Sequence, residues 1–149
     1  MSDRYTLKRT IQVLLVEDNE SDVRLFREAF KDVKLDNNIT VIKDGSEVIS
    51  YLTETEENSK EILPDIIFLD LNLPRKNGIE ILKEIKNNDK LKTIPIIMLS
   101  TSNSSQDIEK CYESHANSYI IKPVDFDKFI YIIKTIETYW LTIAQLPKF

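Results

Sequence analysis

Five short apolar runs, separated by amphipathic segments, constrain the fold of this chain more than any other feature. The runs are rich in Ile, Val and Leu. They span Ile11–Val16, Ile39–Ile42, Ile66–Leu69, Ile96–Leu99 and Tyr119–Ile121. Short runs of this kind are typical of strands that are buried on both faces of a sheet. We therefore expect five buried strands.

The segments between the runs have the spacing of amphipathic helices. In chain order, their apolar stripes contain Val23, Phe26, Phe30 and Val33; Val48, Ile49 and Leu52; Ile81, Leu82 and Ile85; Ile108, Cys111 and Tyr112; and Phe126, Phe129, Ile130, Ile133, Ile136 and Trp140. Asp125 and Asp127 favour the start of the last helix, because carboxylates stabilise the positive helix end. The stretch Thr53–Pro64 is rich in Glu, Thr, Asn and Ser, which predicts a solvated loop.

Strands that alternate with helices imply right-handed crossovers and a parallel sheet. Five such units predict an α/β fold, the flavodoxin-like doubly wound (βα)5 arrangement with a five-stranded parallel sheet in the order 2-1-3-4-5. A length of 149 residues suits one domain. We expect residues 1–149 to form it, with 1–10 as an N-terminal extension and 141–149 as a C-terminal tail. The last helix should end before Pro147.

The composition narrows the class of protein. The net charge of -5 gives no sign of a basic face for nucleic acid. One cysteine allows no intrachain disulfide and favours a reducing compartment. No apolar run approaches the roughly 18 residues that span a bilayer, and the first ten residues do not resemble a signal peptide. We expect a soluble, cytoplasmic protein that binds neither nucleic acid nor membrane.

Polar residues gather where the predicted strands end. Glu17 and Asp18 follow the first strand, Asp70 ends the third, Ser100 follows the fourth and Lys122 follows the fifth. Ligands of open parallel sheets bind beyond these ends, near the switch in strand order. The first and third strands are neighbours in the predicted order, so the three carboxylates should converge.

Converging carboxylates repel one another unless a cation offsets their charge. Mg2+ suits such a site, because it prefers oxygen ligands and uses one or two carboxylates with waters and a phosphate. Lys122 supplies a mobile positive charge for a phosphoryl oxygen, and Ser100 supplies a hydroxyl donor. One nucleophile, one metal, one cation and one donor match phosphoryl transfer to a carboxylate.

Five sequence motifs in order resemble the signatures of response-regulator receiver domains of two-component signalling, similar to chemotaxis regulators. They are VLLVEDN at Val13–Asn19, DIIFLDLNLP at Asp65–Pro74, KNG at Lys76–Gly78, IPIIMLSTS at Ile94–Ser102 and YIIKP at Tyr119–Pro123. They cover most of the chain, from about Ile11 to the last helix. Any one of them alone would be a weak signal, and their order and spacing make the match specific.

The resemblance implies a role for each matching residue. Asp70 would accept the phosphoryl group, and Lys122 would contact it. Asp18 would bind the metal directly, Glu17 through water, and Asn72 through its backbone carbonyl. Ser100 would be the switch hydroxyl and Tyr119 the aromatic switch residue that rotates inward on activation. The Lys122–Pro123 peptide bond is often cis in this family.

A narrower resemblance concerns the regulators that partner bacterial phytochromes and related sensor kinases. It rests on the long loop after the second helix, on IETYWL at Ile136–Leu141 and on Gln145–Pro147. Some members of that group pair through the last strand and last helix. Tyr131, Tyr139 and Trp140 would lie on such a homodimer surface, although side chains at the end of a core helix serve packing equally often.

These inferences predict a stand-alone response regulator, a phosphoacceptor and not an enzyme. A sensor histidine kinase would phosphorylate Asp70 with Mg2+. The modification would switch the surface formed by the fourth helix, fifth strand and fifth helix. Because the last helix is expected to use most of the residues after Lys122, we expect no output domain. The second hypothesis is a receiver-like interaction module that signals without phosphorylation.

Simpler interpretations compete for single residues. Asp18 would also suit an N-cap, and Thr101 and Ser102 would suit caps of the next helix. We expect His115 to be structural, Cys111 to pack in the core, and Glu54, Glu56 and Glu57 to be solvated. Glu17–Glu20 argues against a flavodoxin-type phosphate loop, and Asn72 replaces the second acid of a haloacid-dehalogenase-type phosphohydrolase.

Overall fold

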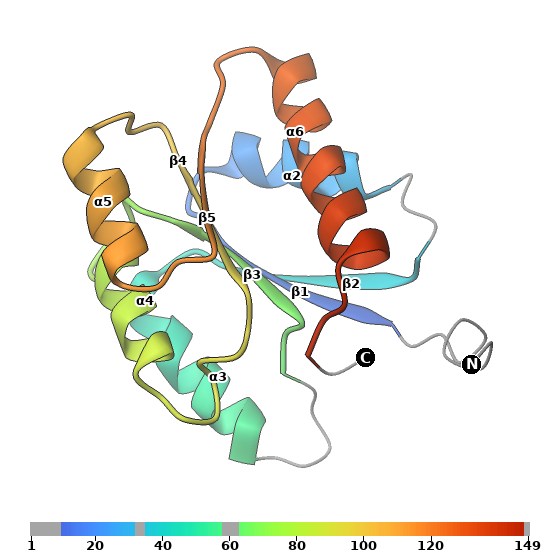
Figure 1. The fold of residues 1–149 in the computed structure, drawn as a ribbon. Coiled ribbons are helices and arrows are strands. Elements are labelled where there is room, and N and C mark those ends of the chain that lie inside the picture. The colour runs from blue at the N-terminus through green and yellow to red at the C-terminus, as the bar shows by residue number, and fades with distance from the viewer. Residues whose placement is uncertain (1–9, 32–34, 58–62, 148–149) are drawn as a thin grey trace.

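The computed structural model describes residues 10–31, 35–57 and 63–147. A parallel five-stranded sheet forms its centre, in the order β2-β1-β3-β4-β5 (Figure 1). The strands are β1 (Ile11–Val16), β2 (Asn37–Ile42), β3 (Ile66–Asp70), β4 (Ile96–Ser100) and β5 (Ser118–Ile121). The predicted α/β class and strand order are confirmed, and each apolar run lies inside a strand.

Helices cover both faces of the sheet (Figure 1). One face carries α3 (Val48–Glu57, after the 3-10 turn Gly45–Glu47), α4 (Gly78–Lys86) and α5 (Ser105–Glu113). The other carries α2 (Glu20–Phe30) and α6 (Phe126–Thr138). The strand side chains therefore belong to two cores, with Leu14 and Val16 in the first and Val13 and Leu15 in the second.

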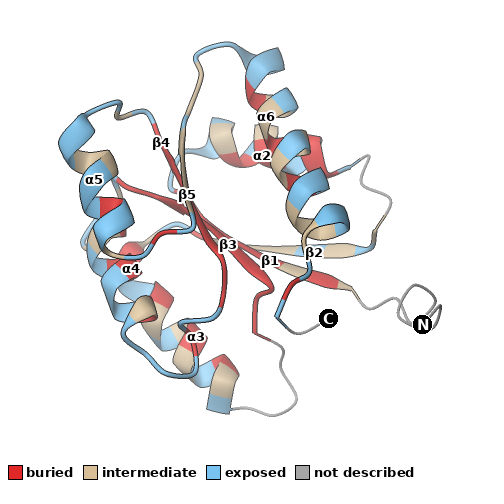
Figure 2. Cartoon of the chain, in the orientation of Figure 1, coloured by how far each residue is buried: buried red, intermediate tan, exposed pale blue. Residues whose placement is uncertain are grey.

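Burial differs between central and edge strands (Figure 2). Every residue of β3 and β4 is buried, as expected for strands between two helical layers. Most of β2 and all of β5 are half-buried or exposed. The expectation of five fully buried strands is therefore wrong for these two, because each lies at an edge of the sheet.

The predicted loop Thr53–Pro64 is wrong for its first part, since α3 continues to Glu57. Thr55 is buried and extends the apolar face of the helix. Glu56 forms an ion pair with Lys90, 3.0 Å between Oε1 and Nζ. The rest of this predicted loop includes residues 58–62, which lie outside the described residues, as do Val33 and most of the predicted N-terminal extension.

The last helix begins as predicted and ends before Pro147 as predicted, with a change of helix type over its last residues. Asp125 is its N-cap and accepts hydrogen bonds from the N–H groups of Asp127 (2.8 Å) and Lys128 (3.2 Å). After Thr138 the chain forms a π-helical turn, η2 (Tyr139–Ile143), and the helical region thus ends before Pro147.

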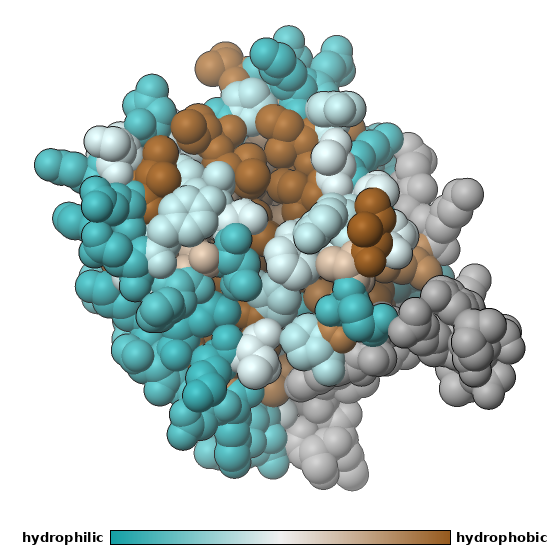
Figure 3. All heavy atoms as spheres, in the orientation of Figure 1, coloured by the Kyte–Doolittle hydropathy of each residue, from teal (hydrophilic) through white to brown (hydrophobic). Residues whose placement is uncertain are grey.

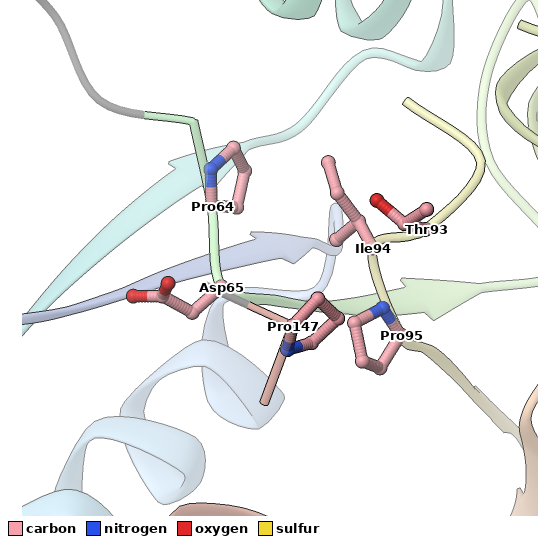
Figure 4. Close-up of a pocket in the computed structure, with 6 residues that line it drawn as sticks. All are labelled: Pro64, Asp65, Thr93, Ile94, Pro95 and Pro147. Carbon is pink, nitrogen blue, oxygen red and sulfur yellow. The ribbon is translucent and has the colours of Figure 1, made fainter. Parts of the chain in front are cut away.

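The chain then turns under the sheet. Leu146 is buried, and Pro147 lies against a small pocket near the amino ends of β3 and β4 (Figure 4). The other lining residues are Pro64, Asp65, Thr93, Ile94 and Pro95. This pocket lies at the amino ends of β3 and β4, opposite to the carboxyl ends that carry the predicted site, and among the described residues Pro147 is the only C-terminal one that lines it.

Candidate functional site

The predicted site residues lie together at the carboxyl ends of four strands. Asp70 and Ser100 are the last residues of β3 and β4. Glu17 and Asp18 follow β1 directly, and Lys122 follows β5. Register fixes this arrangement, because Asp70 pairs with Leu99 and Val16 pairs with Leu69 across neighbouring strands. The sequence-predicted convergence is present in the structure.

The three acids form a compact group. Glu17, Asp18 and Asp70 each offer a carboxylate oxygen, and these oxygens all lie within 4.8 Å of one another. Glu17 and Asp70 are buried, whereas Asp18 is exposed. Asp18 is not the N-cap of α2. Asn19 takes that place and accepts from the Asp22 N–H at 3.0 Å.

Lys122 lies inside the acidic group with only 6% of its side chain exposed. Its Nζ is 2.5 Å from Glu17 Oε1, 2.9 Å from Asp22 Oδ2 and 3.5 Å from Asp70 Oδ2. Burial acts to lower the pKa of this ammonium. The hydrogen bond and charge of Glu17, the charge of Asp70 and the hydrogen bond to Asp22 outweigh burial and raise the pKa. Lys122 is therefore a permanent cation at this site.

Among the three acids, Glu17 has a raised pKa. Burial raises its pKa to about 7, and the charge of Asp70 adds to the rise, against opposing contributions from Lys122 and the Asn19 N–H. Because Glu17 is buried beside two further acids, an additional positive charge would stabilise the ionised carboxylates of this site. The oxygen donors fit a hard divalent cation such as Mg2+. Asp18 and Asp70 would bind it, with Glu17 nearby.

The predicted contribution of Asn72 is a backbone carbonyl. The residue is exposed, two positions after Asp70. The β3–α4 loop that carries it folds back so that the Gly78 N–H donates to the Leu71 carbonyl at 2.7 Å. The metal role of the Asn72 carbonyl stays a prediction.

The two predicted switch residues are joined through the loop after β4. The Ser100 hydroxyl is fully buried and accepts from the Ser102 N–H at 3.1 Å. The Tyr119 hydroxyl donates to the Ser102 carbonyl at 2.9 Å. Ser102 in turn donates its hydroxyl to Asp107 at 2.6 Å. The N-cap of α5 is Ser104, so the expectation that Thr101 or Ser102 caps this helix is wrong.

Sequence reasoning missed Asp22, which binds Lys122 directly. Its residue type gave no signal, because an acid in the first turn of a helix is common. Its spacing gave none either, because Asp18 precedes the N-cap Asn19 and lies outside α2.

The peptide bond between Lys122 and Pro123 is not in the cis form that the resemblance suggested. Residues 10–31, 35–57 and 63–147 contain no cis peptide bond, so this bond is trans. The trans form is favoured by about 0.5–1 kcal/mol for a bond to proline. Elsewhere, Cys111 is buried as predicted, and His115 is exposed just after α5.

Fold and site define a class of protein. The sequence matches the family model of the response regulator receiver domain over residues 13–134, and the chain belongs to this family. Among known proteins it is similar to the response regulator Rcp1 of Synechocystis sp., with 38% identity over 147 residues that cover 99% of both chains. It is also similar to FilR2 of Methanothrix harundinacea, a probable methanogenesis regulatory protein, with 37% identity covering 91% of this chain and 86% of FilR2.

Solved structures give the same result. The phosphorylated cyanobacterial phytochrome response regulator RcpA has a TM-score of 0.88 and 41% identity, covering 93% of this chain and 99% of RcpA. The Mn2+-bound form of Rcp1 has a TM-score of 0.86 and 37% identity, covering 92% and 99%. The described part of the chain contains no helix with the length and apolar character to cross a membrane.

Proposed function

We propose that Asp70 accepts a phosphoryl group, and that this modification switches the surface through which the protein signals. The observation that carries the proposal is the surrounding of Asp70. Asp70 is the last residue of a fully buried strand and is itself 7% exposed, and its carboxylate lies beside those of Glu17 and Asp18 and 3.5 Å from the Lys122 ammonium. A nucleophile needs this combination of limited access and nearby positive charge for phosphoryl transfer.

The donor in this proposal is a phosphohistidine of a sensor kinase. An Asp70 oxygen attacks the phosphorus in line, the N–P bond breaks, and its electron pair returns to the imidazole of the kinase. Lys122 offsets charge on the phosphoryl oxygens, and Ser100 donates a hydrogen bond to one of them. Mg2+ held by Asp18, Asp70 and the Asn72 carbonyl, with Glu17 acting through water, would supply the remaining charge neutralisation.

The switch would begin at Ser100. To reach a phosphoryl group on Asp70, its hydroxyl must leave the hydrogen bond with the Ser102 N–H. Ser102 also holds the Tyr119 hydroxyl, so the loop and the aromatic ring would move together. The surface affected is formed by α5, β5 and α6, which are the fourth helix, fifth strand and fifth helix of the prediction.

The relatives support a partner of the phytochrome type. RcpA is described as a phytochrome response regulator, and a bacteriophytochrome response regulator has 35% identity to this chain and a TM-score of 0.68. We therefore propose a sensor histidine kinase, of the phytochrome class, as the phosphodonor. Transfer from such a kinase to the wild-type protein but not to Asp70→Asn is the expected result.

We propose that the surface of β5 and α6 forms a homodimer when the protein signals. Figure 3 shows apolar side chains gathered on the face that carries these elements. Its exposed apolar and aromatic residues are Ile121, Val124, Phe126, Tyr131 and Tyr139. Light scattering with and without beryllofluoride and Mg2+ tests this surface. A mass that doubles with beryllofluoride in wild type and stays monomeric in Tyr131→Asp supports the dimer, and an unchanged mass in wild type contradicts it.

The phosphoacceptor itself is tested with acetyl phosphate. Uptake should require Mg2+, stop in Asp70→Asn and persist in Asp89→Asn, which removes an exposed acid far along the chain. Equal uptake by wild type and Asp70→Asn would contradict the proposal. Intact partner binding by Asp70→Asn would instead favour an interaction module that signals without phosphorylation.

A further inference from the structure

The Lys122 ammonium has two carboxylate neighbours that are closer than the proposed phosphoacceptor. Glu17 lies at 2.5 Å and Asp22 at 2.9 Å, while Asp70 lies at 3.5 Å. Glu17 belongs to the group of acids that can share a cation, and Asp22 does not. Asp22 is thus a close partner of the lysine with no place among the candidate metal ligands.

The first turn of α2 places Asp22 beside the lysine. The Asp22 N–H donates to the Asn19 side chain at 3.0 Å. Its side chain is 25% exposed, so it reaches Lys122 from the rim of the site rather than from within it. The ammonium arrives from the end of β5, 100 residues later in the chain. The contact therefore joins α2 to β5 across the site.

The position of the Lys122 ammonium affects the binding of a divalent cation and of a phosphoryl group on Asp70 in opposite ways. Among Glu17 and Asp70 it neutralises the same negative charge that a divalent cation would neutralise, so lysine and cation compete. A phosphoryl group on Asp70 has the opposite need, because its oxygens attract the ammonium toward Asp70. An anchor outside the metal group would therefore favour the cation and oppose contact between Lys122 and the phosphoryl group.

We propose that Asp22 is a positioning residue for Lys122. It holds the ammonium at the α2 side of the site, which eases cation entry and weakens the pull of Lys122 on an anion at Asp70. This inference rests on the proposed function. Asp22 would thereby raise the affinity for the cation and weaken the contact between Lys122 and a phosphoryl group, without itself contacting either of them.

The test compares Asp22→Asn with Glu20→Gln. Glu20 lies in the same helical turn, also loses one negative charge, and pairs with Lys43 instead of Lys122. Calorimetric titration with Mg2+ alone should show about fivefold weaker binding for Asp22→Asn, the size expected for one partly exposed ion pair. At saturating Mg2+, beryllofluoride should bind about fivefold tighter, by the same reasoning. Glu20→Gln should change neither affinity by more than about twofold.

A loss of charge near the site also moves both affinities, so the decisive measurement is a double-mutant cycle. In a Lys122→Met background, Asp22→Asn should no longer change beryllofluoride affinity. If the change persists there, Asp22 acts through its field alone and the inference is wrong. Should Lys122→Met fail to fold, crystal structures of metal-free wild type and Asp22→Asn replace the cycle. The variant should bring Nζ closer to Asp70, and an unmoved Nζ would overturn the inference.

The same titrations separate this inference from the proposed function. Wild type that binds beryllofluoride with Mg2+, together with an unchanged Asp22→Asn, rejects only the role of Asp22. Wild type that binds no beryllofluoride, or binds it equally well as Asp70→Asn, rejects both.

Discussion

A Cβ atom on Gly78 would lie 2.3 Å from the backbone carbonyl oxygen of Asp70 and 2.8 Å from the Cα of Leu71. No side chain fits at these distances, so the start of α4 packs directly against the end of β3. The backbone of the proposed phosphoacceptor Asp70 therefore packs directly against Gly78, and this backbone contact helps to determine the position of Asp70.

Gly78→Ala should destabilise the protein by about 1–3 kcal/mol, the usual cost of forcing extra volume into a packed interior. It should also shift the amide resonance of Asp70. Ser105→Ala is the matched control, because Ser105 is the exposed first residue of α5. Urea unfolding of the three proteins measures the difference. A stability of Gly78→Ala equal to that of wild type would contradict the close packing.

Lys86 should contribute to stability far more than its charge suggests. Its Nζ donates to the carbonyls of Lys92 (3.0 Å) and Ile94 (2.9 Å) and to the Asn117 side chain (3.1 Å). Burial lowers the pKa of this ammonium. Lys86→Met should cost about 1–3 kcal/mol, because it removes the Nζ donor from the Lys92 and Ile94 carbonyls, whereas the Asn117 oxygen keeps its hydrogen bond from the Ile96 N–H at 2.8 Å. Lys83→Met, an exposed lysine in the same helix, should cost little in the same denaturant titration.

Cys111 should be unreactive in the native protein. Burial raises the pKa of its thiol to about 11, and the charge of Asp107 adds to the rise. A raised pKa means less thiolate at any pH below it, and thiolate is the reactive form. At pH 8 a disulfide reagent should modify native protein at least about a hundredfold more slowly than protein in urea. An exposed cysteine in Cys111→Ala/Gln106→Cys should react rapidly, and equal rates for Cys111 in both states would contradict its burial.

His115 occupies a backbone conformation that suits glycine. Its φ is 73°, just after the C-terminal end of α5, where the Ala116 N–H donates to the Cys111 carbonyl at 3.0 Å. His115→Gly should stabilise the protein by about 0.5–1 kcal/mol, since it removes the left-handed strain. His115→Ala retains that strain and should bring no gain. Thermal unfolding of both variants distinguishes them.

The fold was predictable because its signals are local. Each apolar run that indicated a strand lies within one, alternation with helices indicates a parallel sheet, and five such units fit the flavodoxin-like order 2-1-3-4-5 that the structure has. The end of α3 was missed for a physical reason. Glu54, Glu56 and Glu57 indicate solvation, whereas the burial of Thr55 on the inner side of the helix depends on the tertiary fold.

The site was predictable where a residue ends a strand, and unpredictable where two distant segments meet. Asp70, Glu17 and Lys122 could be named because parallel strands end at one edge. The pairing of Asp22 with Lys122 joins residues 100 positions apart. The Lys86 contacts likewise depend on where loops pass a helix end. No periodicity in the sequence encodes such contacts.

The central claim is that Asp70 itself carries the phosphoryl group. Borohydride reduction of protein treated with acetyl phosphate and Mg2+ converts an aspartyl phosphate to homoserine, and peptide mass spectrometry then locates it. We expect homoserine at position 70 in wild type and at no carboxylate in protein treated without Mg2+. Homoserine at another acid, or none in a fully folded wild-type protein, would contradict this account.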